Sequence, residues 1–279
     1  MTRGPAETSR EVGLVDLVEY SRRTCLERPI RPTHIPLVMA KGILQYGELA
    51  KYYDLLYQWK DYEKEAGVLK ELVGRYKTSQ GNSLLDVGCG TGKHLRYLTS
   101  EFDCIGMDAS EMMLEQARRS VREVRFVQGD MVSFDLGRQF DIILCLFSSI
   151  GYVRTYTRLR KTMKNFARHL RTGGVTIIEP WFTKSTVKPG YVHVLTQGTD
   201  DLKIVRVDYT DVRGNMTILD ERIVVAERSK GISTYKDRMV MGLFEKDEFL
   251  RGMERAGLKA RYLKKSLAPG RGLYMGTKP

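Results

Sequence analysis

The sequence predicts an α/β fold, with an open and mostly parallel sheet and an antiparallel β insertion after its fifth strand. Between residues 82 and 178, short apolar segments alternate with segments of helical period, which is typical of an open α/β sheet. Between residues 182 and 243 the apolar period becomes that of antiparallel strands. The hydrophobic content of 42% and the charged content of 29% are those of a soluble globular protein. The 279 residues suffice for one domain with an insertion.

The elements follow from local period and turn signals. Five strands are expected in the first part of the fold, at 84–87, 104–107, 124–127, 140–147 and 175–178. Helices are expected between them, at 91–100, 110–120 and 154–171, and two more between 46 and 76. The insertion, 182–243, contains three expected strands, at 202–210, 216–225 and 232–243. A helix at 246–255 and two strands, 260–264 and 272–276, close the fold.

The segment from residue 82 to 94, NSLLDVGCGTGKH, joins the first strand to a helix through a glycine-rich turn. The turn contains three glycines, Gly88, Gly90 and Gly92. Such glycines let the backbone approach a ligand, and the N–H groups that begin the next helix favour an anionic group. Lys93 occupies the third glycine position of a dinucleotide fingerprint, and no Gly-Lys-Ser/Thr closes a P-loop. By itself the turn is as compatible with a purely structural connection between strand and helix as with a ligand-binding site.

Acidic residues follow the second and third expected strands, at the edge where open α/β sheets bind ligands. Asp108 lies 20 residues beyond Gly88 and can accept two hydrogen bonds from vicinal ribose hydroxyls. Ser110 is the better candidate for the N-cap of the next helix. Asp130 can accept from an adenine amino group. These positions predict that a nucleoside ligand binds above the glycine turn.

Composition bears on the class of protein. The longest purely apolar run, 142–147, is too short to span a bilayer, and we expect no signal peptide. The four cysteines are scattered without a C-x-x-C motif, which suits a reducing cytoplasm. The four histidines form no ligand cluster, so we expect no bound metal. The formal charge of +12 favours anionic partners, whether nucleotide phosphates, nucleic acid or acidic lipids.

Two regions differ from the rest of the chain. Residues 1–42 contain four prolines and no sustained periodicity, so we expect a disordered leader before a domain at 43–279. The expected helix at 154–171 carries seven basic residues and no acidic one. Its apolar stripe consists of Leu159, Met163, Phe166 and Leu170. The basic side chains form either a solvated outer face or an anion-binding surface.

The combination of LLDVGCGTG, Asp108, Gln128-Gly129-Asp130 and two closing strands resembles the class I S-adenosylmethionine-dependent methyltransferases. The resemblance implies a Rossmann-like sheet of seven strands, the last antiparallel, and S-adenosylmethionine (S-adenosyl-L-methionine) as cofactor. From residue 46 onward the chain is similar to the dTDP-aminodeoxysugar N,N-dimethyltransferases. This similarity lies in Tyr53-Asp54 through Tyr57, CLFSSIGY, FARHL-x-x-GG, EPWF, GYV and GRGLYMG.

The resemblance also implies two sets of site residues. The turn packs on the amino-acid end of the cofactor, Asp108 holds the ribose, and Asp130 with Met131 frames the adenine. The implied cofactor residues are Tyr62, Asp86, Gly88, Cys89, Gly90, Asp108, Ala109, Asp130, Met131 and Leu146. The implied acceptor residues are Tyr57, Ser149, Glu179, Trp181, Arg206 and Arg271. Family members often carry His where this chain has Tyr152.

The expected reaction is an in-line displacement in which a neutral amine attacks the sulfonium methyl group. Holding the two reactants near attack distance contributes on the order of 7–11 kcal/mol. The amine must first be deprotonated, and Tyr57 or Tyr152 could accept or relay that proton. Because an unperturbed tyrosine has a pKa of about 10, either is a poor base near neutrality, and we expect positioning to matter more.

The expected acceptor is a small-molecule amine, with a nucleotide-linked amino sugar as one candidate. Arg271 lies between glycines before the last strand, and Arg206 lies on the insertion. Two guanidinium groups facing one cleft would suit a pyrophosphate or another anionic handle. The alternatives are another small-molecule N- or O-methyltransferase, an RNA or protein methyltransferase that uses the basic helix, and a non-catalytic cofactor-binding module. The Leu-Phe-Ser-Ser run after the fourth strand argues against a nucleobase amino group. A homodimer is compatible with all of these.

Overall fold

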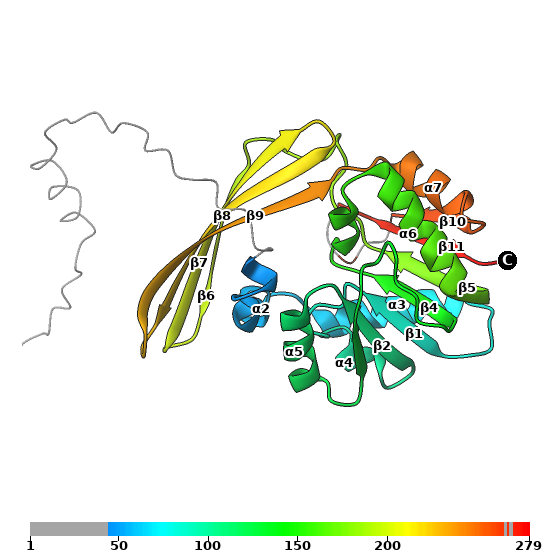
Figure 1. Cartoon of the computed structure of the whole chain (residues 1–279), viewed down its shortest axis with the longest axis horizontal. Helices are drawn as coiled ribbons and strands as arrows, with labels where there is room; N and C mark the ends of the chain where they lie inside the picture. Colours follow the sequence, from blue (N-terminus) through cyan, green and yellow to red (C-terminus); the bar gives the residue numbers. More distant parts are fainter. Residues whose placement is uncertain (1–43, 265–266, 268–269) are drawn as a thin grey trace, which may run out of the picture. The chain divides into compact units, whose positions relative to one another are not determined.

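The computed structural model describes residues 44–264, 267 and 270–279. They all lie within Ala40–Pro279, the second of the two units into which the chain divides. The leader expected at 1–42 lies outside the described residues, so it stays a prediction. Figure 1 labels the helices and strands.

A seven-stranded sheet forms the centre of the second unit (Figure 1). Its strands are β1 (Ser83–Val87), β2 (Asp103–Asp108), β3 (Arg125–Gln128), β4 (Phe140–Cys145), β5 (Leu170–Ile178), β10 (Lys259–Leu263) and β11 (Leu273–Thr277). Their order is β10-β11-β5-β4-β1-β2-β3. Strands β1 to β5 run parallel, and β11 runs antiparallel to both of its neighbours. The predicted fold class, a Rossmann-like sheet with its last strand antiparallel, is confirmed.

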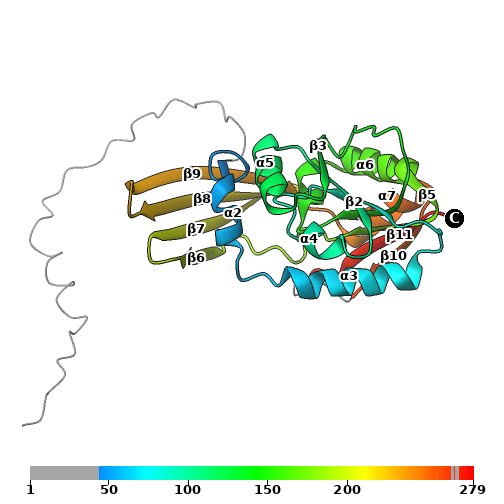
Figure 2. The same ribbon diagram turned by 90° about the horizontal axis from the view of Figure 1, so that it is seen from below.

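Helices cover both faces of this sheet. They are α3 (Tyr62–Tyr76), α4 (Leu95–Leu98), α5 (Glu111–Ser120), α6 (Tyr156–His169) and α7 (Lys246–Glu254). The other helices, η2 (Leu44–Tyr46), α2 (Ala50–Leu56) and η3 (Ser149–Val153), contact the insertion. Leu84 of β1 packs with α3, α4 and α5, whereas Leu85 packs with α6 and α7, because successive side chains of a strand point to opposite faces. Figure 2 shows α3 and α6 on opposite faces. The apolar stripe expected on the basic helix is confirmed for Leu159, Met163 and Phe166, which are fully buried. The fourth predicted member, Leu170, is also fully buried but begins β5 instead of ending the helix.

The helix after the glycine turn is shorter than the sequence predicts. A helix over 91–100 is expected, but α4 contains only Leu95–Leu98. Gly92 has a φ of +76°, which lies outside the right-handed helical region and prolongs the turn. The N-terminus of α4 therefore begins beyond the turn instead of at it, and the prediction of a helix start directly over the ligand is wrong.

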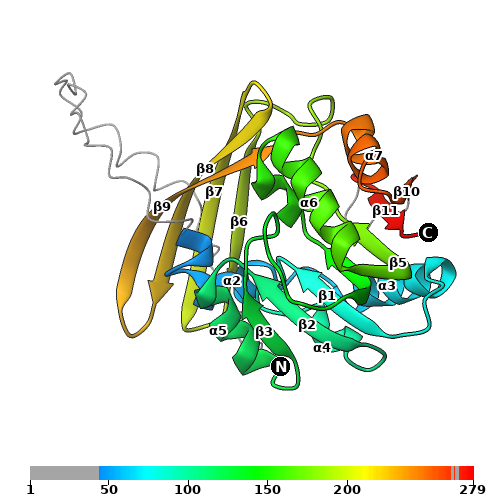
Figure 3. The same ribbon diagram turned by 45° about the vertical axis from the view of Figure 1, so that its right-hand side comes forward.

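The insertion forms a separate antiparallel sheet (Figure 3). Its strands, in spatial order, are β6 (Val192–Gly198), β7 (Leu202–Arg213), β8 (Met216–Glu227) and β9 (Gly231–Gly242). The sequence predicts three of them and misses β6, whose Val192 and Val194 are 58% and 57% exposed. Because Leu195 is the one apolar residue of β6 that packs inward, this strand lacks the alternation that identifies a half-buried strand. Ile204, Ile223 and Val225 form the buried face of this sheet and pack against α2.

In the described part of the chain, no helix has the length and apolar content needed to cross a bilayer. Among the same residues, no three His, Cys, Asp or Glu side chains gather where they could hold a metal ion. Cys89, Cys104 and Cys145 are free thiols. Cys104 and Cys145 are buried and fill space in the core as small apolar side chains do.

Candidate active site

The carboxylate of Asp108, at the end of β2, holds the turn that follows β1. One carboxylate oxygen accepts from the backbone N–H of Gly90 (2.9 Å) and the other from that of Ser110 (2.9 Å). Ser110 caps α5, as predicted, by accepting from the N–H of Met113 (3.1 Å). Burial raises the pKa of Asp108, and the two backbone hydrogen bonds oppose that rise. Each carboxylate oxygen keeps a lone pair for a further donor.

Gly88 brings the same turn against the loop that follows β4. Its φ is +76°, and a Cβ at this position would lie 2.7 Å from the Cβ of Ser149. The hydroxyl of Ser149 donates to the carbonyl of Gly88 (3.3 Å). Both the backbone conformation and this close approach therefore require glycine.

A cavity of about 300 Å³, here called the first cavity, lies over the turn at the carboxyl ends of β1 to β4. All ten residues that the sequence assigns to the cofactor line it. They are Tyr62, Asp86, Gly88, Cys89, Gly90, Asp108, Ala109, Asp130, Met131 and Leu146. The structure thus brings these residues together at the edge where open α/β sheets bind ligands.

A buried carboxylate lies in the wall of the first cavity. Asp86 is 1% exposed, and its Oδ1 has no hydrogen-bond partner within the described residues. Burial, and less strongly the nearby Asp108, raises the pKa of Asp86 to about 7. No basic side chain of the described residues forms an ion pair with either carboxylate, so the first cavity favours a cationic ligand.

A second cavity, of about 480 Å³, adjoins the first. Three residues line both cavities, namely Tyr46, Phe147 and Tyr152. Five residues with predicted acceptor-side roles line the second cavity, namely Tyr57, Tyr152, Trp181, Arg206 and Arg271. The inserted sheet supplies one wall, so a segment far from the glycine turn in sequence completes the site.

Two predicted acceptor residues lie elsewhere. Ser149 lines the first cavity but not the second, and Glu179 lines neither. Glu179 is fully buried, and its Oε2 accepts from the backbone N–H of Phe147 at 2.7 Å. Phe147 and Ser148 have φ values of 48° and 65°, which non-glycine residues rarely adopt. Glu179 therefore holds the strained turn where the two cavities meet.

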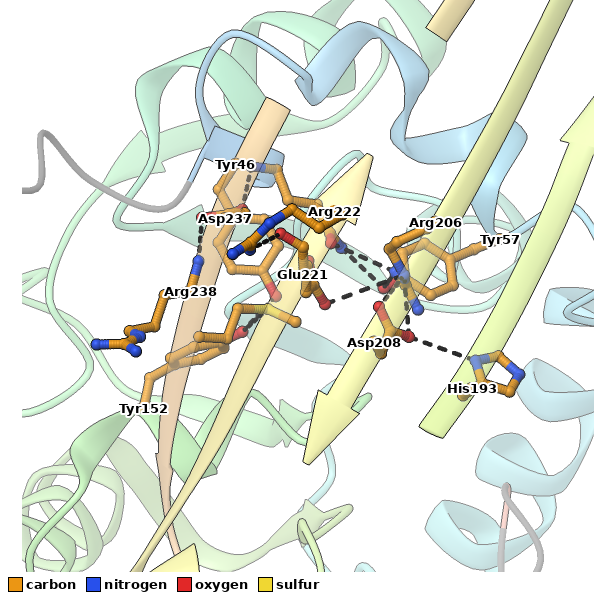
Figure 4. Close-up of polar contacts among 12 residues, drawn as sticks. Tyr46, Tyr57, Tyr152, His193, Arg206, Asp208, Glu221, Arg222, Asp237 and Arg238 are labelled. Atoms are coloured by element: carbon orange, nitrogen blue, oxygen red, sulfur yellow. Dashed lines mark hydrogen bonds and ion pairs between the residues drawn. The ribbon is translucent and has the colours of Figure 1, made fainter. Parts of the chain in front are cut away.

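Arg206 of β7 is already paired. Its Nε lies 2.9 Å from Oδ1 of Asp208, and its Nη1 donates to the hydroxyl of Tyr57 at 2.8 Å (Figure 4). Asp208 also lies 3.3 Å from Nδ1 of His193 on β6. Because Arg206 is buried together with these partners, much of its charge is neutralised before a ligand arrives.

Arg271 has different surroundings. Its Nη1 donates to the hydroxyl of Ser148 at 2.6 Å, and its guanidinium lies over the rings of Trp181 and Phe182 at 5.0 and 4.7 Å. Its Nε is buried without a partner, and no carboxylate of the described residues forms an ion pair with it. Desolvation lowers the pKa of Arg271, and the charge of Glu179 opposes that effect. Arg271 is thus a cation of the second cavity that lacks a close counter-charge.

Comparison with known proteins places this site in a family. Residues 84–174 match the methyltransferase-domain family. The chain is 39% identical over 231 residues to the dTDP-3-amino-3,4,6-trideoxy-alpha-D-glucopyranose N,N-dimethyltransferase of Streptomyces venezuelae, and the match covers 82% of this chain and 97% of that protein. The chain belongs to the dTDP-aminosugar N,N-dimethyltransferase family.

Solved structures of methyltransferases agree with this assignment. Streptomyces venezuelae DesVI superposes with a TM-score of 0.78 at 37% identity, over 83% of this chain and 98% of that one. An amino pentose methyltransferase from Micromonospora echinaspora, solved with S-adenosylmethionine bound, superposes with a TM-score of 0.73 at 29% identity, over 83% and 96% of the two chains. The prediction of an S-adenosylmethionine-dependent methyltransferase is confirmed.

The residues of the first cavity fit the cofactor of the dTDP-aminosugar N,N-dimethyltransferase family. S-adenosylmethionine carries a positive sulfonium and an amino group, and the cavity presents the unpartnered Oδ1 of Asp86. Its ribose offers two hydroxyl donors, and Asp108 retains lone pairs beyond its two backbone bonds. Gly88 and Gly90 line the cavity and carry no side chain, so their backbone can approach a ligand closely.

Several residues of this family member's site were not predicted. Tyr46 and Phe147 form the wall between the cavities, and the only sequence signal for Tyr46 is the density of tyrosines that follow it. Glu221 of β8 lies in the second cavity's wall although it is fully buried. It lies in the charged run Asp220-Glu221-Arg222, which in sequence looks like a solvent-exposed segment. Only the pairing of the strands reveals its position.

Proposed function

We propose that this chain transfers methyl groups to the nitrogen of an amino sugar that is attached to a nucleotide through a pyrophosphate. The amino sugar is supported by three relatives that are N,N-dimethyltransferases of dTDP-linked amino sugars. The observation that supports the anionic handle is Arg271, a guanidinium on the wall of the second cavity without a carboxylate partner among the described residues. A planar fork of N–H donors suits phosphate oxygens.

In this proposal the first cavity holds the cofactor as the resemblance implies. The turn at 88–92 meets the amino-acid end, Asp108 accepts from the ribose hydroxyls, and Asp130 with Met131 frames the adenine. The cofactor supplies a methyl group on a positively charged sulfur, so the donor needs no activation by the protein. The protein then contributes mainly by holding the acceptor nitrogen in line, which is worth on the order of 7–11 kcal/mol.

The test is direct. The purified protein is incubated with S-adenosylmethionine and a set of dTDP-linked amino sugars, each beside the dTDP sugar that carries a hydroxyl in place of the amine. Mass spectrometry should show methyl groups on the amino sugars only. Methylation of the hydroxyl sugars alone, or of no sugar nucleotide, would refute the proposal.

Replacement of Arg271 tests the anionic handle. Loss of a charge-assisted hydrogen bond costs about 1.5–3 kcal/mol, so Arg271→Ala should lower kcat/KM for the acceptor by about ten- to a hundredfold. The affinity for S-adenosylmethionine, measured by calorimetry, should stay nearly constant. Arg251→Ala, which removes an exposed arginine of α7, is the matched control. A loss of cofactor affinity in Arg271→Ala would instead assign Arg271 to the cofactor side.

We also propose that the protein works in the cytoplasm. Its three described cysteines are free thiols, as proteins of reducing compartments usually keep them.

A further inference from the structure

Four titratable side chains form a row across the inserted sheet. His193 of β6 lies opposite Asp208 of β7, Asp208 lies opposite Glu221 of β8, and Glu221 lies opposite Asp237 of β9. Residues directly opposite one another on neighbouring strands project from the same face. The row therefore places three carboxyl groups side by side, as Figure 4 shows. Like charges in such positions repel, so the arrangement needs compensation.

The outer members of the row have partners. Asp237 accepts from the backbone N–H groups of Leu44 (3.1 Å) and Gln45 (2.8 Å). Asp208 is paired with Arg206 at 2.9 Å and with His193 at 3.3 Å. Both carboxylates therefore have partners, although Oδ1 of Asp208 accepts no hydrogen bond from the described residues.

Glu221, in the middle of the row, is different. It is fully buried, and neither oxygen has a hydrogen-bond donor within the described residues. Its ion-pair partner among the described residues is Arg206, whose Nε lies 4.0 Å from Oε1. Burial raises the pKa of Glu221 to about 8; Arg206 opposes the rise, and Asp208 and Asp237 add to it. A buried carboxyl group without donors is costly, and this one lies in the wall of the second cavity.

Two tyrosines of the same cavity, Tyr57 and Tyr152, cannot take a proton near neutrality. The hydroxyl oxygen of Tyr57 already accepts from Gln45 Nε2 (2.7 Å) and from Arg206 Nη1 (2.8 Å). Tyr152 donates to the sulfur of Met239 (3.1 Å). Burial raises the pKa of both phenols above its ordinary value, so neither is a base for an ammonium group.

We propose that Glu221 receives the proton of the acceptor's ammonium group before each methyl transfer, directly or through one water molecule. This inference rests on the proposed function, because it requires an amine acceptor. In the step, an N–H bond of the substrate breaks and its electron pair stays on nitrogen as the nucleophilic lone pair. An O–H bond forms on a Glu221 oxygen, and Glu221 later releases this proton to bulk water.

The proton balance explains how a carboxyl group of raised pKa serves an amine. An ammonium beside a carboxylate and an amine beside a carboxylic acid contain the same number of protons, so the pair titrates as a unit. When the acceptor nitrogen and Glu221 together gain one more proton, Glu221 is a carboxylic acid and the nitrogen is an ammonium group. The nitrogen then has no lone pair and methyl transfer stops. The rate should therefore fall as the pH falls. The charged and titratable groups that face Glu221, directly or through this network, are Tyr57, Tyr152, His193, Arg206, Asp208 and Asp237.

Glu221→Gln tests the proposal, since the amide keeps the shape of the side chain but cannot take the proton. At neutral pH we expect kcat/KM for the amino sugar to fall by about a hundredfold or more, as for the loss of a general base. The loss should shrink toward high pH, where the amine is already neutral in solution. Calorimetric affinity for S-adenosylmethionine should not change. Asp220→Asn is the matched control, because Asp220 is the adjacent residue of β8 and pairs with Arg238.

A second variant tests the same step while Glu221 is retained. Asp208 raises the pKa of Glu221, so Asp208→Asn should move the acidic limb of the kcat profile to lower pH. Glu221→Gln with wild-type kcat/KM, or with a loss that is equal at every pH, would overturn the inference alone. If the acidic limb of the kcat profile does not move in Asp208→Asn, the inference is also overturned, even if Glu221→Gln fails to fold. A wild-type protein that methylates no amino sugar would overturn the proposed function and this inference together.

Discussion

Asp86 predicts a pH dependence of cofactor binding. Its pKa lies at about 7 in the folded protein, against an ordinary value of 3.8. Well below neutrality the carboxyl group is protonated, so a cationic ligand that needs the carboxylate must first displace a proton. We therefore expect the Kd of S-adenosylmethionine to rise about tenfold for each pH unit below 6, which corresponds to about 1.4 kcal/mol per unit.

The same shift predicts how stability depends on pH without a ligand. A carboxyl group whose pKa is raised by folding binds a proton more tightly in the folded state, so stability falls as the pH rises from about 4 to about 7. The difference between the ordinary pKa of 3.8 and the folded-state pKa of about 7 corresponds to on the order of 4 kcal/mol. Asp86→Asn should lack this dependence, and at neutral pH and above it should exceed the wild type in its free energy of unfolding.

Calorimetry from mildly acidic to neutral pH, with urea unfolding at the same values, measures both effects. The Asp86→Asn protein should bind S-adenosylmethionine weakly and with little dependence on pH in this range. Asp103→Asn, at the exposed start of β2, is the control. A wild-type Kd that stays constant over this range would refute the reasoning, because Asp86 would then either stay ionised or make no contact with the cation.

Three further predictions concern neighbouring positions. Asp108→Ala should weaken cofactor binding and also lower the free energy of unfolding by about 1–3 kcal/mol for each backbone N–H, at Gly90 and Ser110, that loses its acceptor; calorimetry and urea unfolding measure the two effects. Gly88→Ala should abolish measurable cofactor binding, because the new Cβ would collide across the turn at a φ of +76°. Glu221→Gln should be more stable than the wild type above pH 8, since the wild type must then keep a buried charge; equal unfolding curves there would contradict this.

The central sheet and the first cavity could be predicted because their signals are local. The apolar segment that becomes β1, the glycines that follow it and the capping serine Ser110 each specify their own conformation within a few residues. Asp108 and Asp130 follow strands whose parallel order brings both to one edge of the sheet. A pattern along the chain was therefore sufficient to place them together.

The second cavity depends on pairing between distant segments, which no local pattern contains. Glu221 is buried only because β7 and β9 flank it, and its opposite neighbours Asp208 and Asp237 are 13 and 16 residues away in the sequence. Strand β6 was missed because two of its three apolar side chains, Val192 and Val194, face outward. The short α4 was missed because a positive φ at Gly92 is not visible in a helical period.

The wall between the cavities has a thermodynamic consequence. The carbonyl oxygen of Tyr46 accepts from the hydroxyl of Ser110 (2.5 Å), whose backbone N–H donates to Asp108. The hydroxyl of Tyr46 lies 2.7 Å from that of Tyr152. A ligand in either cavity therefore lies against the rings of Tyr46 and Tyr152, which line both cavities. If the cofactor raises the affinity for the acceptor by some factor, the acceptor must raise the affinity for the cofactor by that factor too. One coupling free energy then governs both the order in which the two ligands enter and the ease with which spent cofactor is exchanged between turnovers.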